Sequence, residues 1–151
     1  MSNQNNTRFL LNIKDPNIIF SDNSVRKEIV KGIECNVVTA SLSPSNPKHC
    51  MHCGCINTLY SIIKNGSKTV TLRLNRCSGI TTYLKLKKCR FYCKNCKRTF
   101  IDQCSIVKPN CSITTSVYHQ VILDIKTKQS VLDIAKRNDV SHTTLNTWIH
   151  S

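Results

Sequence analysis

The chain has 151 residues, carries 22 Lys and Arg against 8 Asp and Glu, and contains ten cysteines. No part of it approaches the roughly 18 consecutive apolar residues of a transmembrane helix, and residues 1–20 lack the apolar core of a signal peptide, which argues against a membrane or secreted protein. We therefore expect a cytoplasmic protein, in whose reducing surroundings closely spaced cysteines indicate metal binding rather than disulfides.

The positive charge is concentrated in the middle of the chain. Residues 48–108 hold thirteen Lys and Arg against one Asp, a net of +12, whereas residues 1–47 (five against four) and 109–151 (four against three) add +1 each to reach the total of +14. Clustered Lys and Arg attract phosphate backbones because their binding releases condensed counterions. The charge predicts a nucleic-acid partner, and a merely well-solvated surface is the alternative.

Strand-like segments occupy the first two thirds of the chain. Residues 1–32 alternate only weakly and are interpreted as a lead-in of undefined structure. From Ile33 to Leu42 apolar residues recur at every second position, which predicts a half-buried strand. Between Leu59 and Leu74, Asn65-Gly66 is a strong signal for a hairpin turn between two antiparallel strands. Thr81–Phe91 alternates leucine with lysine and is expected to form a third ribbon strand.

In the last third, the spacing of apolar residues changes from two to about 3.6, which predicts helices. The first helix is expected over residues 113–127. Ser130 with Asp133 three residues later forms a capping box at the start of a second helix, which runs to about Asn138. Ser141 is the predicted N-cap of a third helix.

The second and third helices, joined by a tight turn, are typical of a helix-turn-helix. Their shared core is expected to consist of Ile134, Val140, Leu145 and Trp148. The outward side of the third helix carries short polar side chains suited to the edges of a DNA groove, namely His142, Thr143, Asn146 and Thr147. An ordinary amphipathic helix pair with a solvated polar face is the alternative.

Two C-x-x-C pairs, Cys50 with Cys53 and Cys93 with Cys96, carry the strongest chemical signal. Four deprotonated sulfurs in a tetrahedron suit one structural zinc ion and leave no open position for a substrate. Gly54 follows the first pair, where such a turn often needs a residue without a Cβ atom. The second pair has a lysine at that place, which is a weaker fit.

The residues around these pairs have several possible roles. Cys55 and His52 lie close enough to the first pair to compete for the metal, with a less favourable geometry. The other cysteines lack a partner at this spacing and are interpreted as small buried residues. Basic residues on the third strand and around the second pair are expected to contact DNA, namely Lys85, Lys87, Arg90, Lys94, Lys97 and Arg98.

Together these elements predict an α+β fold, a small β-rich zinc ribbon followed by a three-helix helix-turn-helix domain. Residues 1–47 form a lead-in whose one strand, Ile33 to Leu42, joins the ribbon. Residues 48–108 form the zinc-ribbon domain, and residues 109–151 form the helix-turn-helix domain.

Several longer motifs cover most of the chain: Ile13-Lys14-Asp15-Pro16-Asn17-Ile18, Cys50-x-x-Cys53-Gly54, Arg90-Phe91-Tyr92-Cys93-x-x-Cys96 with Thr99-Phe100, Asp133-Ile134-Ala135-Lys136-Arg137, and Val140-Ser141-His142-Thr143-Thr144. Together they resemble the N-terminal part of insertion-sequence transposases of the ISL-three type, which carry a zinc-finger region, a helix-turn-helix and a DDE catalytic domain. Asn138 departs from the family pattern, because an apolar core residue usually stands there, and this predicts weaker helix packing.

The resemblance implies recognition of the terminal inverted repeats of a mobile element. Its partners would be double-stranded DNA and a full-length transposase, without a membrane or a small-molecule substrate. Because too little chain follows the last helix to build a DDE domain, we expect a nucleoid-associated DNA-binding fragment that is no enzyme by itself. Two alternatives stay open, a free-standing transcriptional regulator and a zinc-ribbon module that binds RNA or protein.

Overall fold

The structure, a computed structural model, contains one mixed β-sheet and four short helices, and it describes residues 3–43, 47–109, 111–127 and 130–149. Within the sheet the strands lie in the order β1 (Ile18–Val30), β2 (Ile33–Leu42), β4 (Thr82–Cys93) and β3 (Ile62–Arg73), and β5 (Thr99–Ile101) pairs with β4. The pairing of β2 with β4 is parallel and the other pairings are antiparallel.

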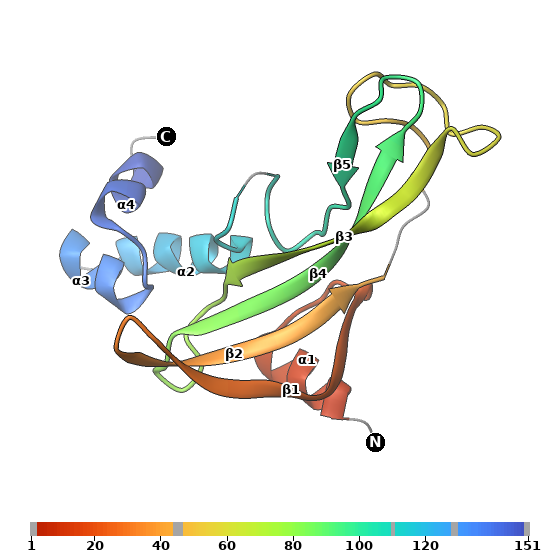
Figure 1. Cartoon of the computed structure of the whole chain (residues 1–151). Coiled ribbons are helices and arrows are strands. Elements are labelled where there is room, and N and C mark those ends of the chain that lie inside the picture. Colours follow the sequence, from red (N-terminus) through yellow and green to blue (C-terminus); the bar gives the residue numbers. More distant parts are fainter. Residues whose placement is uncertain (1–2, 44–46, 110, 128–129, 150–151) are drawn as a thin grey trace.

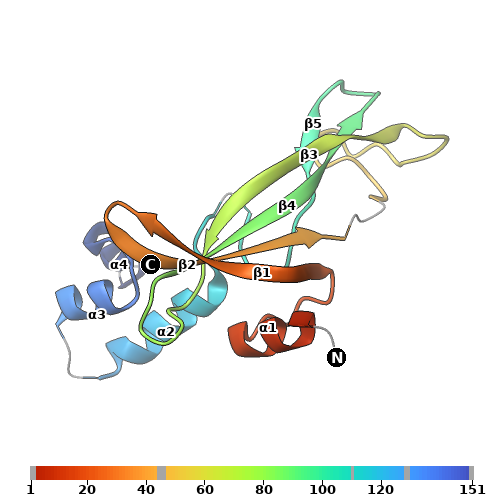
Figure 2. The same ribbon diagram turned by 60° about the horizontal axis from the view of Figure 1, so that its bottom comes forward.

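The helices lie at the margins of this sheet. Helix α1 (Asn3–Leu11) precedes the sheet and packs against β1. Helices α2 (Thr115–Ile125), α3 (Val131–Arg137) and α4 (His142–Ile149) gather at one end of the sheet, and β5 lies at the other end (Figures 1 and 2). None of the helices in the described ranges is long and apolar enough to cross a membrane.

The predicted zinc ribbon followed by a three-helix helix-turn-helix domain is wrong. A single five-stranded sheet dominates the described residues, and none of the four described helices is longer than 11 residues. The prediction lacked β1, a strand of 13 residues, whose side chains are buried at only three places, Ile18, Phe20 and Ser24. A strand so little buried has no apolar alternation to detect, because solvent tolerates polar residues on both of its faces.

Hydrogen bonds connect the last three helices to the sheet. Arg76, just beyond β3, makes two hydrogen bonds of 2.6 and 2.8 Å to the carboxylate of Asp139, which lies between α3 and α4. The hydroxyl of Thr81 donates to the same carboxylate at 2.9 Å, and Arg73 donates to the carbonyl of Asp139. The turn between α3 and α4 is therefore part of the contact with the sheet.

The tight turns differ from the predicted one. Asn65-Gly66 does not join two strands but bulges out of the single strand β3, between the paired residues Lys64 and Ser67. The hairpin turns are Lys31-Gly32, between β1 and β2, and Ser78-Gly79, between β3 and β4. All four of these turn residues have the positive φ that a two-residue primed turn requires.

One face of the sheet is apolar and covered by the rest of the chain. It carries Phe20, Val38, Leu72, Leu84 and Leu86, and the cover consists of Leu11 and Ile13 near α1 with Cys104 and Val107 from the segment after β5.

Asp15 joins the two parts of this cover, because its carboxylate accepts hydrogen bonds from the backbone N–H and the hydroxyl of Ser105, both at 3.0 Å. Burial by itself raises the pKa of Asp15, but the bonds from Ser105 and Asn17 and the charge of Arg8 hold this pKa below its ordinary value.

Helices α2, α3 and α4 share a second, smaller core. The predicted core residues Ile134, Val140 and Leu145 are buried in it, and Trp148 packs partly against it. Ser130 caps α3 by accepting the N–H of Asp133 at 3.1 Å. Asn138 is buried, and its amide donates to a carboxylate oxygen of Asp124 at 2.8 Å and to the carbonyl of Ile134 at 3.0 Å, so this polar residue is satisfied within the core.

Candidate metal centre and basic surface

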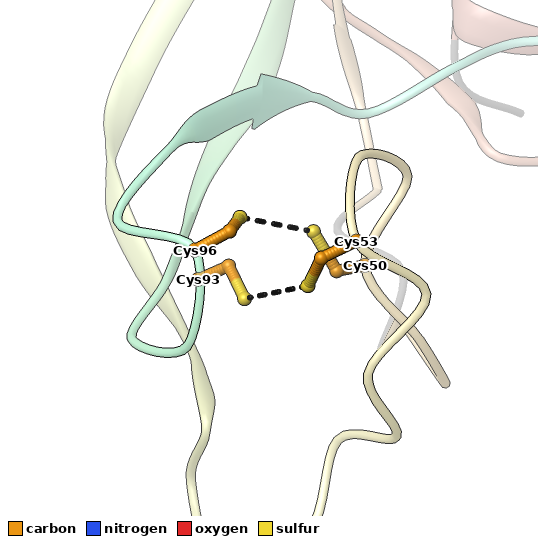
Figure 3. Close-up of side chains that lie close together, drawn as sticks. All are labelled: Cys50, Cys53, Cys93 and Cys96. Atoms are coloured by element: carbon orange, nitrogen blue, oxygen red, sulfur yellow. Dashed lines mark hydrogen bonds between the residues drawn. The ribbon is translucent and has the colours of Figure 1, made fainter.

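Four cysteines meet at the end of the sheet that carries β5 (Figure 3). Cys93 is the last residue of β4 and Cys96 lies in the turn to β5, while Cys50 and Cys53 come from the loop before β3. The Sγ atoms of Cys50 and Cys96 are 3.7 Å apart, those of Cys53 and Cys93 are 3.8 Å apart, and all four lie within 4.8 Å of one another. The four cysteines can hold one metal ion.

The two C-x-x-C turns share one backbone hydrogen bond and one left-handed residue. In each turn the residue after the second cysteine donates its N–H to the carbonyl of the first, Gly54 to Cys50 at 3.0 Å and Lys97 to Cys93 at 2.9 Å. Both of these residues have positive φ, +74° for Gly54 and +59° for Lys97. The expected need for a left-handed residue therefore holds in both turns, and the second turn meets it with a lysine.

A third apolar cluster packs around two of the four cysteines. Cys50 and Cys93 are buried together with Ile62, Phe91 and Phe100, and the rings of the two phenylalanines lie 5.5 Å apart. These aromatic residues come from β4 and β5, next to the second cysteine pair. The packing therefore holds two of the four sulfurs in place independently of a metal.

The sulfurs differ in how readily they lose a proton. The side-chain amide of Asn95 donates to the Sγ of Cys53 at 3.5 Å, and this bond, together with one from the backbone of Cys55, lowers the pKa of Cys53 to about 6. A backbone hydrogen bond from Cys96 also lowers the pKa of Cys93, whereas burial raises that of Cys96 to about 11. The surroundings thus favour thiolate, the metal-binding form, first in one cysteine of each pair.

The two neighbours expected to compete for the metal lie beside the cluster. The Sγ of Cys55 is 3.4 Å from that of Cys93, and this hydrogen bond, followed by burial, raises the pKa of Cys55 to about 12. The Nε2 atom of His52 is 3.1 Å from the carbonyl oxygen of Thr99. Neither residue belongs to the group of four mutually close ligands.

The remaining cysteines are only partly as expected. Cys35 and Cys104 are buried, Cys77 and Cys89 are half-buried, and Cys111 is exposed. The interpretation as small buried residues therefore holds for the first two alone.

The polar residues predicted to face DNA lie on the open side of α4. His142, Thr143 and Thr147 are exposed, and Asn146 is half-buried, with its amide nitrogen 3.2 Å from Nδ1 of His142. Leu145 on the opposite side is fully buried. Helix α4 therefore presents a polar surface while its apolar side anchors it in the helical core.

The predicted basic residues follow β4 toward the metal centre. Lys85 and Arg90 are half-buried on the strand, Lys87 is exposed, and the turn after the strand exposes Lys94, Lys97 and Arg98. Lys85 is partly neutralised, because its Nζ lies 3.8 Å from a carboxylate oxygen of Glu28. Since α4 and the metal centre lie at opposite ends of the sheet (Figures 1 and 2), the structure places the ten predicted residues in two groups rather than in one patch.

Sequence reasoning missed the contacts that hold α4 in place and a cavity beside it. Arg76 and Asp139 are 63 residues apart, and no local pattern indicates such a pair.

Comparison with known proteins adds no relative, because no protein-family model, curated protein or solved structure matches this chain.

Proposed function

We propose that this chain binds double-stranded DNA at the terminal inverted repeats of a mobile element, as the DNA-binding part of an insertion-sequence transposase. The observation that carries the proposal is the placement of two candidate contact groups, α4 and the metal-centre turn, at the two ends of a strongly basic sheet. Strand β4 runs between them with 12 residues. At about 3.3 Å per residue it spans roughly 40 Å, close to one turn of B-DNA at about 34–36 Å.

A duplex lying along the sheet would meet these groups one after the other. Helix α4 is a suitable reader of the major groove, since Thr143, Asn146 and Thr147 are short side chains that reach base edges without large entropy loss. Lys94, Lys97 and Arg98 would contact phosphates about one helical turn away and so fix the register. The resemblance of the sequence motifs to those of ISL-three transposases favours inverted repeats as the target.

We propose zinc as the metal of the four-cysteine centre. A regular tetrahedron with Zn–S bonds of about 2.3 Å has S···S edges of about 3.8 Å. The two short Sγ–Sγ distances, 3.7 and 3.8 Å, agree with that edge. Four thiolates are also the ligand set that zinc prefers, and they leave no position for water or substrate.

The role of zinc in this proposal is structural. It would tie the loop that carries Cys50 and Cys53 to the end of β4, and so hold the basic turn of Lys94, Lys97 and Arg98 in one conformation. A rigid turn loses less entropy on contacting phosphates than a mobile one. Removing the metal should therefore weaken DNA binding as well as stability.

A gel-shift assay tests the proposal with three probes of equal length, namely a duplex carrying the inverted repeat that flanks the gene, an unrelated duplex and a structured RNA. We expect the inverted repeat to bind at least 1,000-fold more tightly than the unrelated duplex at physiological salt, in the range typical of specific DNA-binding proteins, roughly 10³–10⁷. Elemental analysis of the same preparation should find one zinc per chain.

The other outcomes separate the alternatives. Tight binding to a fourth probe, a palindromic duplex from near the gene, and not to the inverted repeat, would identify a transcriptional regulator. Preference for the RNA, or equal affinity for all three probes, would reject sequence-specific DNA recognition altogether.

A further inference from the structure

A cavity of about 370 Å³ lies between the segment before α2 and helix α4, outside both groups of predicted DNA contacts. Its walls include Tyr118 of α2, Trp148 of α4, Lys108 and Thr114. The ligand pockets of proteins usually measure about 300–1,000 Å³, so this one suits a single flat ring system better than a larger molecule.

The aromatic residues of the cavity form a right-angled corner. The rings of Tyr118 and Trp148 lie 5.2 Å apart with an angle of 82° between their planes. A planar ligand that enters such a corner stacks on one ring and turns its edge toward the other, which are the two preferred geometries of aromatic contacts. Both side chains are only half-buried and reach the surface of the cavity.

The polar groups of the cavity suit a phosphate and a ring with polar edges. The ammonium group of Lys108 lies 5.4 Å from the centre of the Tyr118 ring, on an exposed side chain. The buried hydroxyl of Thr114 has no hydrogen-bond partner among the residues that the structure describes. Nucleobases combine a stacking face with hydrogen-bonding edges, and their phosphate would meet the lysine.

A second cavity adjoins the first. The two share Ser112, Ile113 and Thr144 as lining residues, and the second is lined also by Arg73 and by Asp139, whose carboxylate is paired with Arg76. The guanidinium of Arg73 stacks on Tyr83, 4.9 Å from the ring centre, and its buried Nε atom has no partner within the described ranges. A nucleic-acid strand that left its base in the first cavity would pass along this arginine.

We infer that the corner of Tyr118 and Trp148 accepts one unpaired nucleotide of a DNA strand, with its base stacked on the aromatic rings and its phosphate beside Lys108. This inference rests on the proposed DNA binding and adds to it a site for a base that has left the duplex. Such a base avoids the cost of unpairing when it is already single-stranded or bulged. The chain should therefore prefer DNA with an unpaired nucleotide over a fully paired duplex of the same length.

Trp148 is the single tryptophan of the chain, so the tryptophan fluorescence comes from a side chain of this cavity. The full chain is titrated with a paired duplex, the same duplex with one bulged nucleotide, the bulged duplex with an abasic residue in the bulge, a single strand and a free nucleoside monophosphate. We expect the bulged duplex and the single strand to quench Trp148, and the paired and abasic duplexes to leave its emission unchanged. If the free nucleotide quenches Trp148 at the same concentrations as the single strand does, the inference that the cavity accepts a nucleotide of a DNA strand would be overturned.

Variants separate stacking from charge. Tyr118→Ala should weaken binding of the bulged duplex by roughly 5- to 150-fold, the range observed per stacked base, whereas Tyr118→Phe should keep the wild-type affinity. Tyr60→Ala is the matched control, because Tyr60 is exposed and lies in the loop before β3. Lys108→Gln, on an exposed side chain that leaves the core intact, should reduce the salt dependence of single-strand binding by about 0.7 in the logarithmic slope.

The failure of this inference can be told from the failure of the proposed function. If the chain binds the inverted-repeat duplex but binds bulged and paired probes equally well, and the emission of Trp148 does not change, the cavity site is overturned. The proposed DNA binding would still stand. Quenching by single strands without any shift of a duplex would support the cavity site and reject the proposed duplex recognition.

Discussion

At the scale of single residues, the two turns of the metal centre depend on a backbone conformation that most side chains avoid. Gly54 adopts it with φ of +74°, and a Cβ atom built there meets no other atom within 4 Å. Gly54→Ala should therefore act through the backbone alone and lower the free energy of unfolding by about 1–2 kcal/mol. Chemical denaturation of the metal-loaded chain measures this change.

Lys97 offers the opposite test. Lys97 has a φ of +59°, so Lys97→Gly should relieve backbone strain in the folded state and raise the free energy of unfolding. The greater flexibility of glycine in the unfolded chain makes this increase smaller. The net effect on the free energy of unfolding should lie within about 1 kcal/mol of zero and on the stabilising side. A loss larger than that of Gly54→Ala would contradict the conformational account of both turns.

The four clustered cysteines should give the largest effects of single substitutions. Cys50→Ser and Cys93→Ser should each lower the bound metal well below one ion per chain and destabilise the fold by several kcal/mol, because a structural zinc contributes about 10–16 kcal/mol of apparent binding free energy. Cys77→Ser, at a half-buried cysteine outside the cluster, should leave the metal content unchanged. Metal analysis and thermal unfolding check both effects, and equal losses in all three variants would reject the ligand assignment.

Asp139 makes the attachment of the helices to the sheet sensitive to pH. Burial by itself raises the pKa of Asp139, but hydrogen bonds from Arg76 and Thr81 and the charges of Arg76 and Arg73 hold it below its ordinary value of 3.8. A depressed pKa in the folded state means that the carboxylate stabilises the fold above about pH 4, and that this contribution is lost as the pH falls through the folded-state pKa.

Asp139→Asn tests this contact with little disturbance of the backbone, since asparagine tolerates the φ of +57° found there. The variant should lose about 1–2 kcal/mol of stability at neutral pH, a modest figure because the side chain of Arg76 is 36% exposed and its ion pair is screened by solvent. Once the pH is below the folded-state pKa of Asp139, the wild type and the variant should unfold alike. A difference that persists in acid would show that the carboxylate charge is not the cause.

At the scale of elements, α4 and the end of β4 have different tasks in the proposed complex. Asn146→Ala should reduce discrimination between the inverted repeat and an unrelated duplex by about 1–3 kcal/mol, the amount that one good contact with a base contributes. Lys97→Gln should weaken binding to both duplexes equally, because phosphates are the same in every sequence. Competition gel shifts measure the ratio, and the reverse assignment of effects would exclude α4 as the reading helix.

The elements also differ in how well the sequence predicted them. Strand β2 matches the predicted range Ile33–Leu42, and β4 is close to the predicted Thr81–Phe91, because both have one buried face and therefore alternate. The strand β1 and the bulge at Asn65-Gly66 were not predictable in the same way. An exposed edge strand places few constraints on its residues, and a turn-forming pair is equally compatible with a bulge.

At the scale of the whole molecule, the net charge of +14 should govern the affinity for DNA. If the duplex contacts both ends of the sheet and its phosphates meet about six to ten cations, the binding constant should fall by about 10³–10⁵ between 50 and 200 mM salt. A salt titration of the wild type measures the slope. A slope that corresponds to only one or two phosphate contacts would mean that the duplex does not run along the sheet.

The sequence by itself determined the local features of this protein, namely the four cysteines that can hold one metal ion, strands β2 and β4, the buried apolar positions of the last helices, and the N-caps Ser130 and Ser141. These depend on spacing and periodicity over a few residues, which a sequence displays directly. Only the tertiary structure decided that the strands form one mixed sheet, that Arg76 and Asp139 fix the helices to it, and that Tyr118 and Trp148 frame a cavity. Each of these joins residues far apart in the chain, and such contacts depend on which surfaces can be buried together, a choice that no local pattern records.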